Sequence, residues 1–301
     1  MDTRIKSGYD VGESAKPRKP VVNLYWPQAK GPDRAMTSNG KMELRFDGSV
    51  AILAFNDPAV LNAIGHRMRE DFSAALDRIE ASGARCILLT GNGRAFCSGA
   101  NLNDPDRPPR DRAAEARGEQ KSDLEGWYNP TLERLRASSI PVVSAVNGAA
   151  AGIGMSFALS ADIRIAARSG YFLQAFARIG LVPDGGATWI LPRLVGMARA
   201  MELSMLAERL PAETALEWGM VNRVVDDEAL MDEAMAMARR LADGPASLGL
   251  IRRLYWQGLE QGYSAQLKAE ADTQTVAGQT RDYEEGVAAF REKRPAAFSG
   301  R

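Results

Sequence analysis

The stretch that most constrains the fold is residues 141–162, PVVSAVNGAAAGIGMSFALSAD. Its apolar, β-branched opening at 142–146 has the length and composition of a buried strand. Small residues then lead to Gly152 and Gly154, and an apolar helical pattern follows. The first N–H groups of a helix have no partner within it, and the helix dipole adds positive potential there. A strand, a glycine turn and a helix in this order therefore predict an anion site at the turn, with Ile153 at the start of the helix.

Three uses of this turn are compatible with the pattern. A dinucleotide pyrophosphate would call for a third glycine where Phe157 stands, and for an acidic residue about 20 residues further on, which is missing. A transient oxyanion would need a second donor from elsewhere in the chain. A turn that serves only packing is the third possibility.

Composition and charge exclude several classes of function. The 301 residues contain 45% hydrophobic and 25% charged residues, as in soluble globular proteins, and 38 basic side chains balance 38 acidic ones. This balance gives no reason to expect nucleic acid or a membrane as partner. No apolar run reaches transmembrane length, we expect no signal peptide, and two cysteines make no disulfide framework, so we expect a cytoplasmic protein. With His66 as the single histidine, the sequence predicts no metal site, and catalysis must rest on carboxylates, hydroxyls and backbone groups.

The chain divides into three regions. Residues 1–40 are rich in Lys, Arg, Pro and Gly and are predicted to be a flexible extension. Residues 41–227 begin with a predicted hairpin (43–46 and 50–55) and a helix whose apolar face ends at Gly83. Strands at 86–89 and 163–167, a mobile surface loop at 103–122, a helix from 124 to 137 and a turn at 180–188 follow. Helices at 197–207 and 212–218 and a strand at 221–225 complete this region, in which a strand–strand–helix unit recurs about every 45 to 50 residues, as in stacked turns. Residues 228–301 are predicted to be helical, with breaks near 244–245 and at 262.

Six motifs in order resemble the crotonase, or enoyl-CoA hydratase/isomerase, superfamily from residue 41 to residue 301. They are PAVLNA (58–63), AFCSGANL (95–102), AVNGAAAGIG (145–154), GLVPDGGATWILPRLVG (180–196), EWGMVNRVV (217–225) and EGVAAFREKRPAAFSG (285–300). The resemblance implies an α/β fold, a spiral of ββα turns over 41–227 followed by a helical trimerisation region over 228–301. It also implies an acyl-CoA thioester as substrate, a homotrimer or a dimer of trimers, and no cofactor beyond the coenzyme A of the substrate.

The resemblance supplies the second donor for an oxyanion. In this superfamily two backbone N–H groups hold the thioester oxygen, and they correspond here to Ala100 and Ile153. Each such donor is worth roughly 2.7–4 kcal/mol in comparable oxyanion holes. The resemblance therefore implies that the anion at the turn is an enolate.

The departures from the superfamily pattern bear on the reaction. Its hydratases use two glutamates, and Ser156 and Phe176 occupy the corresponding positions here. Neither side chain is a general acid or base at neutral pH, which disfavours water addition by two carboxylates.

Asp184, in a Pro-Asp-Gly-Gly turn, is the remaining candidate base. An aspartate in such a turn usually only forms the turn, but the resemblance places it where several isomerases of the superfamily carry their catalytic aspartate. We expect Phe176, Val182 and Trp189 to desolvate it and raise its pKa. One carboxylate can move a proton from one carbon of an enolate to another, so the pattern favours an isomerase. It looks most like the ring-1,2-epoxyphenylacetyl-CoA isomerases and the Δ3,Δ2-enoyl-CoA isomerases, and it does not separate them.

The resemblance also implies contacts to substrate from a further set of residues. They are Asn62, Ala63, Gly99, Asn101, Tyr128, Ser156, Phe176, Phe290 and Lys293, the last two from a neighbouring subunit. Two alternatives to the isomerase stay open at this point: a hydratase that uses other groups, and a member of the superfamily that binds CoA thioesters without chemistry.

Overall fold

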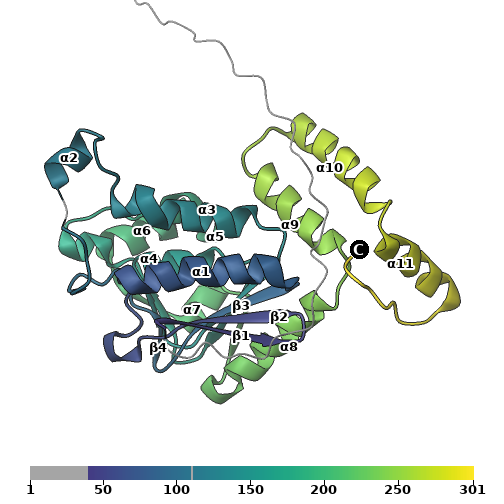
Figure 1. The fold of residues 1–301 in the computed structure, drawn as a ribbon, viewed down its shortest axis with the longest axis horizontal. Helices are drawn as coiled ribbons and strands as arrows, with labels where there is room; N and C mark the ends of the chain where they lie inside the picture. The colour runs from purple at the N-terminus through teal and green to yellow at the C-terminus, as the bar shows by residue number, and fades with distance from the viewer. Residues whose placement is uncertain (1–39, 110) are drawn as a thin grey trace, which may run out of the picture.

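The computed structural model describes residues 40–109 and 111–301 (Figure 1). The predicted extension at 1–40 thus lies, but for its last residue, outside the described residues. The described chain is a mixed α/β structure in which two sheets are followed by a C-terminal series of helices.

The larger sheet has six strands in the order β1-β2-β3-β5-β7-β10. The predicted hairpin is confirmed, because β1 (Met42–Asp47) and β2 (Val50–Phe55) pair antiparallel with Asp47 opposite Val50. The remaining strands are parallel: β3 (Cys86–Gly91), β5 (Val142–Val146), β7 (Ile163–Ala167) and β10 (Arg223–Val225). Strands β3 and β5 are buried along their whole length, which agrees with their continuous apolar sequence.

The smaller sheet consists of β4 (Ala95–Cys97), β6 (Ala149–Ala151), β8 (Tyr171–Leu173) and β9 (Arg209–Pro211). The first three are parallel, and β9 runs antiparallel to β8. Each of the pairs β3–β4, β5–β6 and β7–β8 gives one strand to each sheet before the chain continues into helical structure. This repetition confirms the expected spiral of ββα turns.

Helices surround the two sheets (Figure 1). The first, α1 (His66–Ser82), buries Met68, Phe72 and Ile79 and ends at Gly83, whose φ of 76° is the left-handed conformation that glycine adopts without strain. The others in the spiral are α2 (Arg112–Ala116), α3 (Asn129–Ala137), α4 (Ile153–Leu159), α5 (Ala187–Val195), α6 (Met197–Leu206) and α7 (Ala212–Glu217). Short 3₁₀ turns cover Pro58–Val60, Ala175–Ile179 and Asp227–Ala229, and a π-helical turn covers Leu124–Tyr128.

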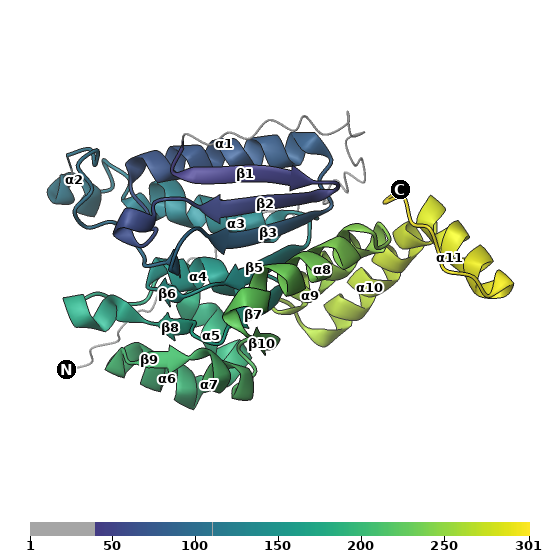
Figure 2. The ribbon, with the colours of Figure 1, turned by 90° about the horizontal axis from the view of Figure 1, so that it is seen from below.

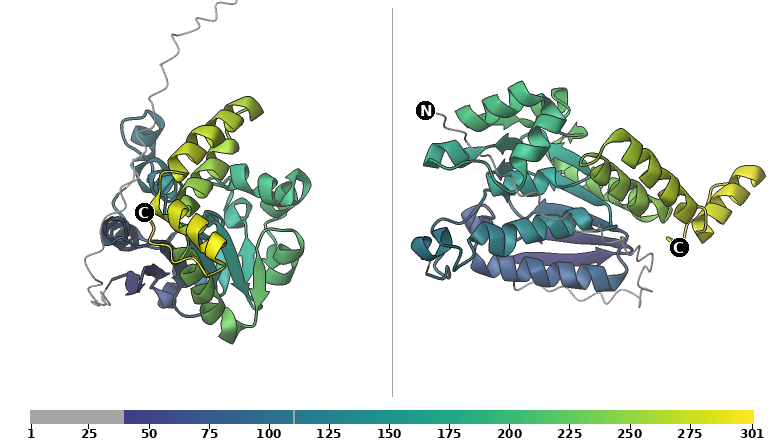
Figure 3. Two further views of the ribbon diagram at one scale, coloured as in Figure 1. Left: turned by 90° about the vertical axis from the view of Figure 1, so that its right-hand side faces the viewer. Right: turned by 90° about the horizontal axis from the view of Figure 1, so that it is seen from above.

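The C-terminal helices fall into two groups. Helix α8 (Leu230–Ala242) packs its alanine face, including Ala234 and Ala238, against the six-stranded sheet. Helices α9 (Ser247–Gly258), α10 (Tyr263–Ala277) and α11 (Arg281–Glu292) follow, and α10 and α11 extend away from the sheets (Figures 2 and 3). The predicted breaks near 244–245 and at 262 are confirmed, and a third lies at 278–280. The prediction of helix up to residue 301 is wrong, because α11 ends at Glu292 and residues 293–301 form no helix.

Four local predictions within residues 41–227 also need correction. The turn predicted at 180–188 ends earlier, since α5 begins at Ala187. Helix α5 buries Ala187, Leu191 and Val195, and this packing outweighs the helix-breaking effect of Pro192. The loop at 103–122 contains α2, because the Asp111 carboxylate accepts from the N–H groups of Ala113 and Ala114. The helix predicted at 124–137 opens with the π turn. Strands β6 and β9 were not predicted; β6 consists of three alanines, and pairing with β4 and β8 holds it extended.

An aromatic cluster fills the core beneath α4. Phe157 of α4 lies 6.0 Å from Phe55 and 5.3 Å from Phe72, measured between ring centroids, and Phe96 lies 5.4 Å from Phe55. All four rings are fully buried. Phe157 is thus a core residue. A dinucleotide-binding fingerprint needs a glycine at this position so that helix and strand can pack closely, and the Phe157 ring occupies that space. Among the described helices, none is long and apolar enough to cross a membrane.

Candidate active site

The turn between β6 and α4 has the geometry expected of an anion site. Gly152 adopts φ 52° and ψ −130°, a backbone conformation that side chains disfavour, and its N–H donates to the Leu173 carbonyl at 2.9 Å. Ile153 is the first residue of α4, so its N–H has no partner inside the helix. The turn therefore presents a backbone donor at a helix N-terminus.

The segment that follows β4 lies beside this turn. Gly99 has φ 107°, and a Cβ placed on it would lie 3.0 Å from the Ala151 carbonyl oxygen and 3.9 Å from Gly152 Cα. On its other side this segment bridges Ile64: the Ile64 N–H donates to the Gly99 carbonyl, and the Asn101 N–H donates to the Ile64 carbonyl. In such a parallel bridge the N–H of the middle residue, Ala100, points away from Ile64, toward the side where α4 begins. The structure thus places Gly99, the neighbour of Ala100, beside Gly152, the neighbour of Ile153.

Asp184 stands on the turn between the 3₁₀ segment 175–179 and α5. Its carbonyl oxygen accepts two hydrogen bonds, from Ala187 N–H at 3.1 Å and from Ser156 Oγ at 3.0 Å. Its carboxylate differs: Oδ1 is buried and has no hydrogen-bond partner among the described residues. Burial raises the pKa of Asp184 to about 6. A carboxylate in this state is a stronger base than an exposed aspartate.

The three side chains that were expected to desolvate Asp184 differ in their surroundings. Val182 is 79% exposed and does not desolvate it, which corrects the prediction. The Trp189 ring stacks on Trp256 of α9, with centroids 6.1 Å apart. Phe176 is buried, and a Cβ placed on Gly152 would lie 3.8 Å from its Cζ, so this ring forms an apolar wall beside the oxyanion turn.

Tyr128 ends the π turn that precedes α3 and is 5% exposed. Burial is the main reason that the pKa of its phenol lies well above the ordinary value; the Arg69 guanidinium acts in the opposite direction, and Asp184 is among the charges that reinforce the rise. Tyr128 therefore lies within electrostatic reach of Asp184 and keeps its hydroxyl proton at neutral pH. A π-helical turn at such a position is common at functional sites.

Arg69 is a residue that the sequence prediction missed. It is 8% exposed on α1, and its guanidinium carbon lies 5.8 Å from the centroid of the Tyr128 ring. It pairs with Asp123 at 2.8 Å, and Arg107 pairs with the other oxygen of Asp123 at 2.8 Å. Burial alone would raise the pKa of Asp123, but the two guanidinium groups lower it below its usual range. The helical spacing could have predicted its burial, since Arg69 lies three residues before the buried Phe72 and thus on the same face of α1.

Asn62 and Asn101, which were expected to contact coenzyme A, use their side chains for hydrogen bonds to nearby backbone groups. Asn62 is fully buried; its Oδ1 accepts from Asp57 N–H at 2.8 Å, and its Nδ2 donates to the carbonyls of Asn92 and Ala95 at 2.9 and 2.7 Å. The Asn101 Oδ1 accepts from Asn103 N–H. The N–H groups of Asn62 and Ala63 donate to the carbonyls of Asp57 and Val60, and the Gly99 carbonyl accepts from Ile64 N–H, so these backbone groups also serve the local fold.

Phe290 and Lys293 lie on and just after α11, and Phe290 is 85% exposed. Helix α11 projects from the end of the molecule opposite to the turn region around α4 and α6 (Figure 2). One chain alone does not bring these two residues to Asp184.

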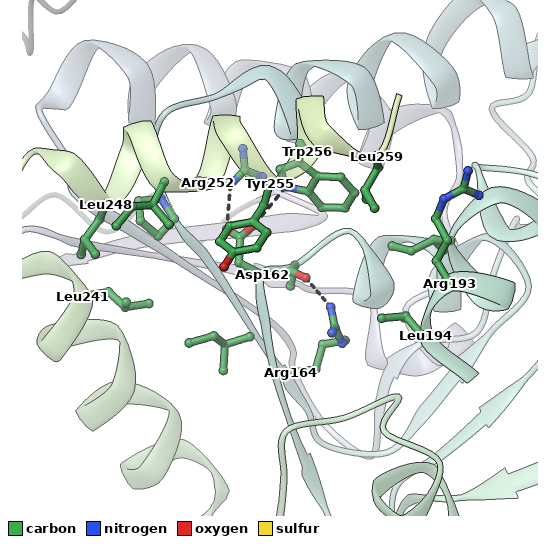
Figure 4. A pocket seen from close by; sticks show the side chains of 15 residues that line it. Asp162, Arg164, Arg193, Leu194, Leu241, Leu248, Arg252, Tyr255, Trp256 and Leu259 are labelled. Carbon is green, nitrogen blue, oxygen red and sulfur yellow. Dashed lines mark hydrogen bonds and ion pairs between the residues drawn. The ribbon is translucent and has the colours of Figure 1, made fainter. Parts of the chain in front are cut away.

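A cavity of about 480 Å³ lies between α5, α8 and α9 (Figure 4). Its polar groups bind one another: Arg252 Nε donates to Asp162 Oδ2 at 2.7 Å, and Trp256 Nε1 donates to Asp162 Oδ1 at 3.2 Å (Figure 4). Arg252 also donates to carbonyls at the end of α3, including that of Leu135. The lining contains neither Asp184 nor the oxyanion residues. This cavity is therefore separate from Asp184 and the start of α4.

Comparison with known proteins identifies the family. The sequence profile of the Enoyl-CoA hydratase/isomerase family matches residues 45–301. The chain is 44% identical over 254 residues to a 1,2-epoxyphenylacetyl-CoA isomerase of Escherichia coli (strain K12), covering 84% of this chain and 95% of that protein. It is 45% identical over 253 residues to a probable enoyl-CoA hydratase of Rhodobacter capsulatus, with the same coverage of 84% and 95%.

A solved structure supports the same assignment. The crystal structure of a putative enoyl-CoA hydratase/isomerase from Mycobacterium abscessus superimposes with a TM-score of 0.79 at 34% identity, covering 86% of this chain and all of that one. By its sequence and its α/β spiral, this chain belongs to the enoyl-CoA hydratase/isomerase family and has the crotonase fold.

Proposed function

We propose that the protein isomerises an acyl-CoA thioester through an enolate, with Asp184 as the single base and the N–H groups of Ala100 and Ile153 as the oxyanion hole. The observation that carries this proposal is the state of Asp184. Its carboxylate oxygen Oδ1 is buried without a hydrogen bond among the described residues, and its backbone is bonded to the helix that begins at Ile153. A base held in this way is suited to abstract a proton next to a thioester carbonyl.

A single carboxylate is sufficient for both proton transfers of the isomerisation. With a 3-enoyl-CoA, Asp184 takes a proton from C2, and the electron pair of the C–H bond enters the conjugated enolate, whose oxygen the two N–H groups hold. The same carboxyl group then returns the proton to C4, the electrons reform the thioester carbonyl, and the double bond lies between C2 and C3. The donors contribute because they are stronger partners for the enolate oxygen than for the neutral carbonyl.

A ring-derived thioester is a second substrate class within this proposal. It is favoured by the 44% identity to a 1,2-epoxyphenylacetyl-CoA isomerase. In both classes coenzyme A enters only as part of the substrate, and we propose no other cofactor and no metal. We further propose that the enzyme works in the cytoplasm as a homotrimer or a dimer of trimers.

Hydration is the competing activity, since another relative is named a probable enoyl-CoA hydratase. Two features of the site oppose it. Phe176 offers no proton-transfer group, and the Ser156 hydroxyl is bonded to the Asp184 carbonyl. A water molecule would therefore lack the second carboxylate that activates it.

The test is a paired assay on the full chain. Wild-type protein is given a 3-enoyl-CoA, 1,2-epoxyphenylacetyl-CoA or a 2-enoyl-CoA, and the products are resolved by mass spectrometry. We expect isomerisation of at least one of the first two and little hydration of the third. Faster hydration than isomerisation would assign the protein to the hydratases, and binding without any product would make it a non-catalytic member of the family.

A further inference from the structure

The base and the oxyanion hole meet at one side chain, Ser156. This serine lies three residues after Ile153 in α4, so both side chains are on the same face of that helix. It is 3% exposed, and its Oγ donates to the Asp184 carbonyl at 3.0 Å. A single turn of α4 thus contains an oxyanion donor at one end and a tether to the base at the other.

Close packing at the next residue reinforces this tether. A Cβ placed on Gly185 would lie 2.3 Å from Ile153 Cδ1 and 2.9 Å from Ser156 Cβ, distances that real Cβ atoms do not reach. Gly185 therefore lies directly on the side chains of Ile153 and Ser156. The turn that carries Asp184 is thus held against the first turn of α4 by the Ser156 hydrogen bond and by the close contact of Gly185.

The Asp184 carboxylate itself lacks such a constraint. Its Oδ1 has no hydrogen-bond partner among the described residues, so the direction of the side chain depends on how its backbone is held. A hydrogen bond to the carboxylate would fix its position but would also weaken it as a base, because it would favour the charged form. A hydrogen bond to the Asp184 carbonyl instead orients the residue without lowering the basicity of its carboxylate.

We propose that Ser156 is a positioning residue, which sets the distance between the Asp184 carboxylate and the oxyanion donor of Ile153 by holding the backbone carbonyl of Asp184. This inference rests on the proposed role of Asp184 as the base. It gives a function to the hydroxyl at a position where the hydratases of the family use a glutamate. Ser156 acts through Asp184 and exchanges no proton with the substrate.

The test compares Ser156→Ala with a matched control, Ser144→Ala. Ser144 is also fully buried, and its Oγ donates to a carbonyl of the same helix, that of Ala158, at 3.2 Å, at the opposite end of α4 from Ile153. Both variants lose one buried hydroxyl-to-carbonyl bond, so we expect similar falls in melting temperature. For isomerisation of a 3-enoyl-CoA we expect kcat to fall about 10- to 100-fold in Ser156→Ala only, with KM changed less than about twofold. The rate at which the α-hydrogens of phenylacetyl-CoA exchange in deuterated water should fall in parallel.

The possible outcomes separate this inference from the proposed function. If kcat of Ser156→Ala stays within twofold of wild type while Asp184→Asn is inactive, Ser156 does not position the base and the proposed function stands. Equal losses of kcat in Ser156→Ala and Ser144→Ala would show that the role is structural and would also overturn the inference. If Asp184→Asn retains full activity, the proposed function fails, and the inference fails with it.

Discussion

At the scale of single residues, the environment of Asp184 determines what the site can do. Its carboxylate loses water on folding and gains no hydrogen bond at Oδ1 in exchange, and this burial raises its pKa to about 6. An ordinary surface aspartate would be a weak base for a carbon acid. Folding thus makes the charged form of this one residue less stable and more reactive.

The pH dependence of activity should follow this titration. Abstraction requires the charged form, so kcat/KM for isomerisation should be level at neutral pH and fall about tenfold per pH unit below about 6. The measurement is initial rates at low substrate from pH 4.5 to 8.5. An apparent pKa near 4 would show that the free enzyme does not desolvate its base.

The same burial predicts a gain in stability on removing the charge. Because the folded-state pKa lies above the ordinary value of 3.8, the folded chain binds more protons than the unfolded chain between about pH 4 and 6, and its stability falls as pH rises through that window. Asp184→Asn should therefore be more stable than wild type at pH 8, by about 1 kcal/mol after allowing for solvent screening, and not at pH 3.5. Denaturant unfolding at the two pH values checks this, and a variant that is less stable at pH 8 would contradict it.

At the scale of elements, the pairing of β4 with β6 positions the two donors of the proposed oxyanion hole. The two short strands run parallel, with Ala95 opposite Ala149, so the chain leaves both at the same edge of the sheet. There one strand leads into the glycine that precedes α4 and the other into Gly99 and Ala100. Both donors are backbone groups, so the strands and the helix rather than side chains position them.

A proline at Ile153 tests this arrangement. The first position of a helix tolerates proline, because its N–H has no helical partner. Ile153→Pro should therefore keep the fold and lower kcat about 10²- to 10³-fold, the usual cost of one oxyanion donor. Ile153→Val, which keeps the N–H, should retain most of the activity despite the burial of this side chain. Full activity of the proline variant with an unchanged circular dichroism spectrum would exclude the amide as a donor.

The elements also show how far the sequence could be interpreted. The long strands β2, β3 and β5 and helix α1 were predicted, because their periodicity and their glycine and proline boundaries are local signals. The three alanines of β6 and the proline in α5 carry the opposite local signal, and tertiary pairing and packing decide their conformation. In the site, the strand–glycine–helix pattern predicted Ile153, and the resemblance to the superfamily predicted Asp184 and Ala100. Neither the exposure of Val182 nor the contact of Arg69 with Tyr128 could be predicted, because both depend on how distant segments pack.

At the scale of the whole molecule, the C-terminal helices raise the question of assembly. Asp282 of α11 is buried, and its carboxylate accepts from the N–H groups of Ala246 and Gly300. Deleting the C-terminus would therefore disturb the start of α9 as well as any subunit contact. Point substitutions at exposed positions are the cleaner probe.

We predict a particle of three or six chains of 32.6 kDa by analytical ultracentrifugation. If a neighbouring chain supplies Phe290 and Lys293 to the site, Phe290→Ala and Lys293→Ala should each raise KM for the acyl-CoA about tenfold, equivalent to roughly 1.4 kcal/mol of binding. Since Phe290 is exposed within one chain, its replacement should not lower the stability of the monomer fold. A monomeric particle, or KM unchanged in both variants, would rule out this shared site.

The central claim is that one carboxylate, Asp184, carries the proton between two carbons of the substrate. The most direct measurement is isomerisation of a 3-enoyl-CoA in deuterated water by wild type and by Asp184→Asn, with the product analysed for rate and deuterium content. We predict that wild-type product retains part of the original hydrogen, because a buried carboxyl group returns it before exchange with solvent is complete. We also predict that Asp184→Asn binds the substrate but turns over about 10²- to 10⁴-fold more slowly. Undiminished turnover by Asp184→Asn would contradict the account.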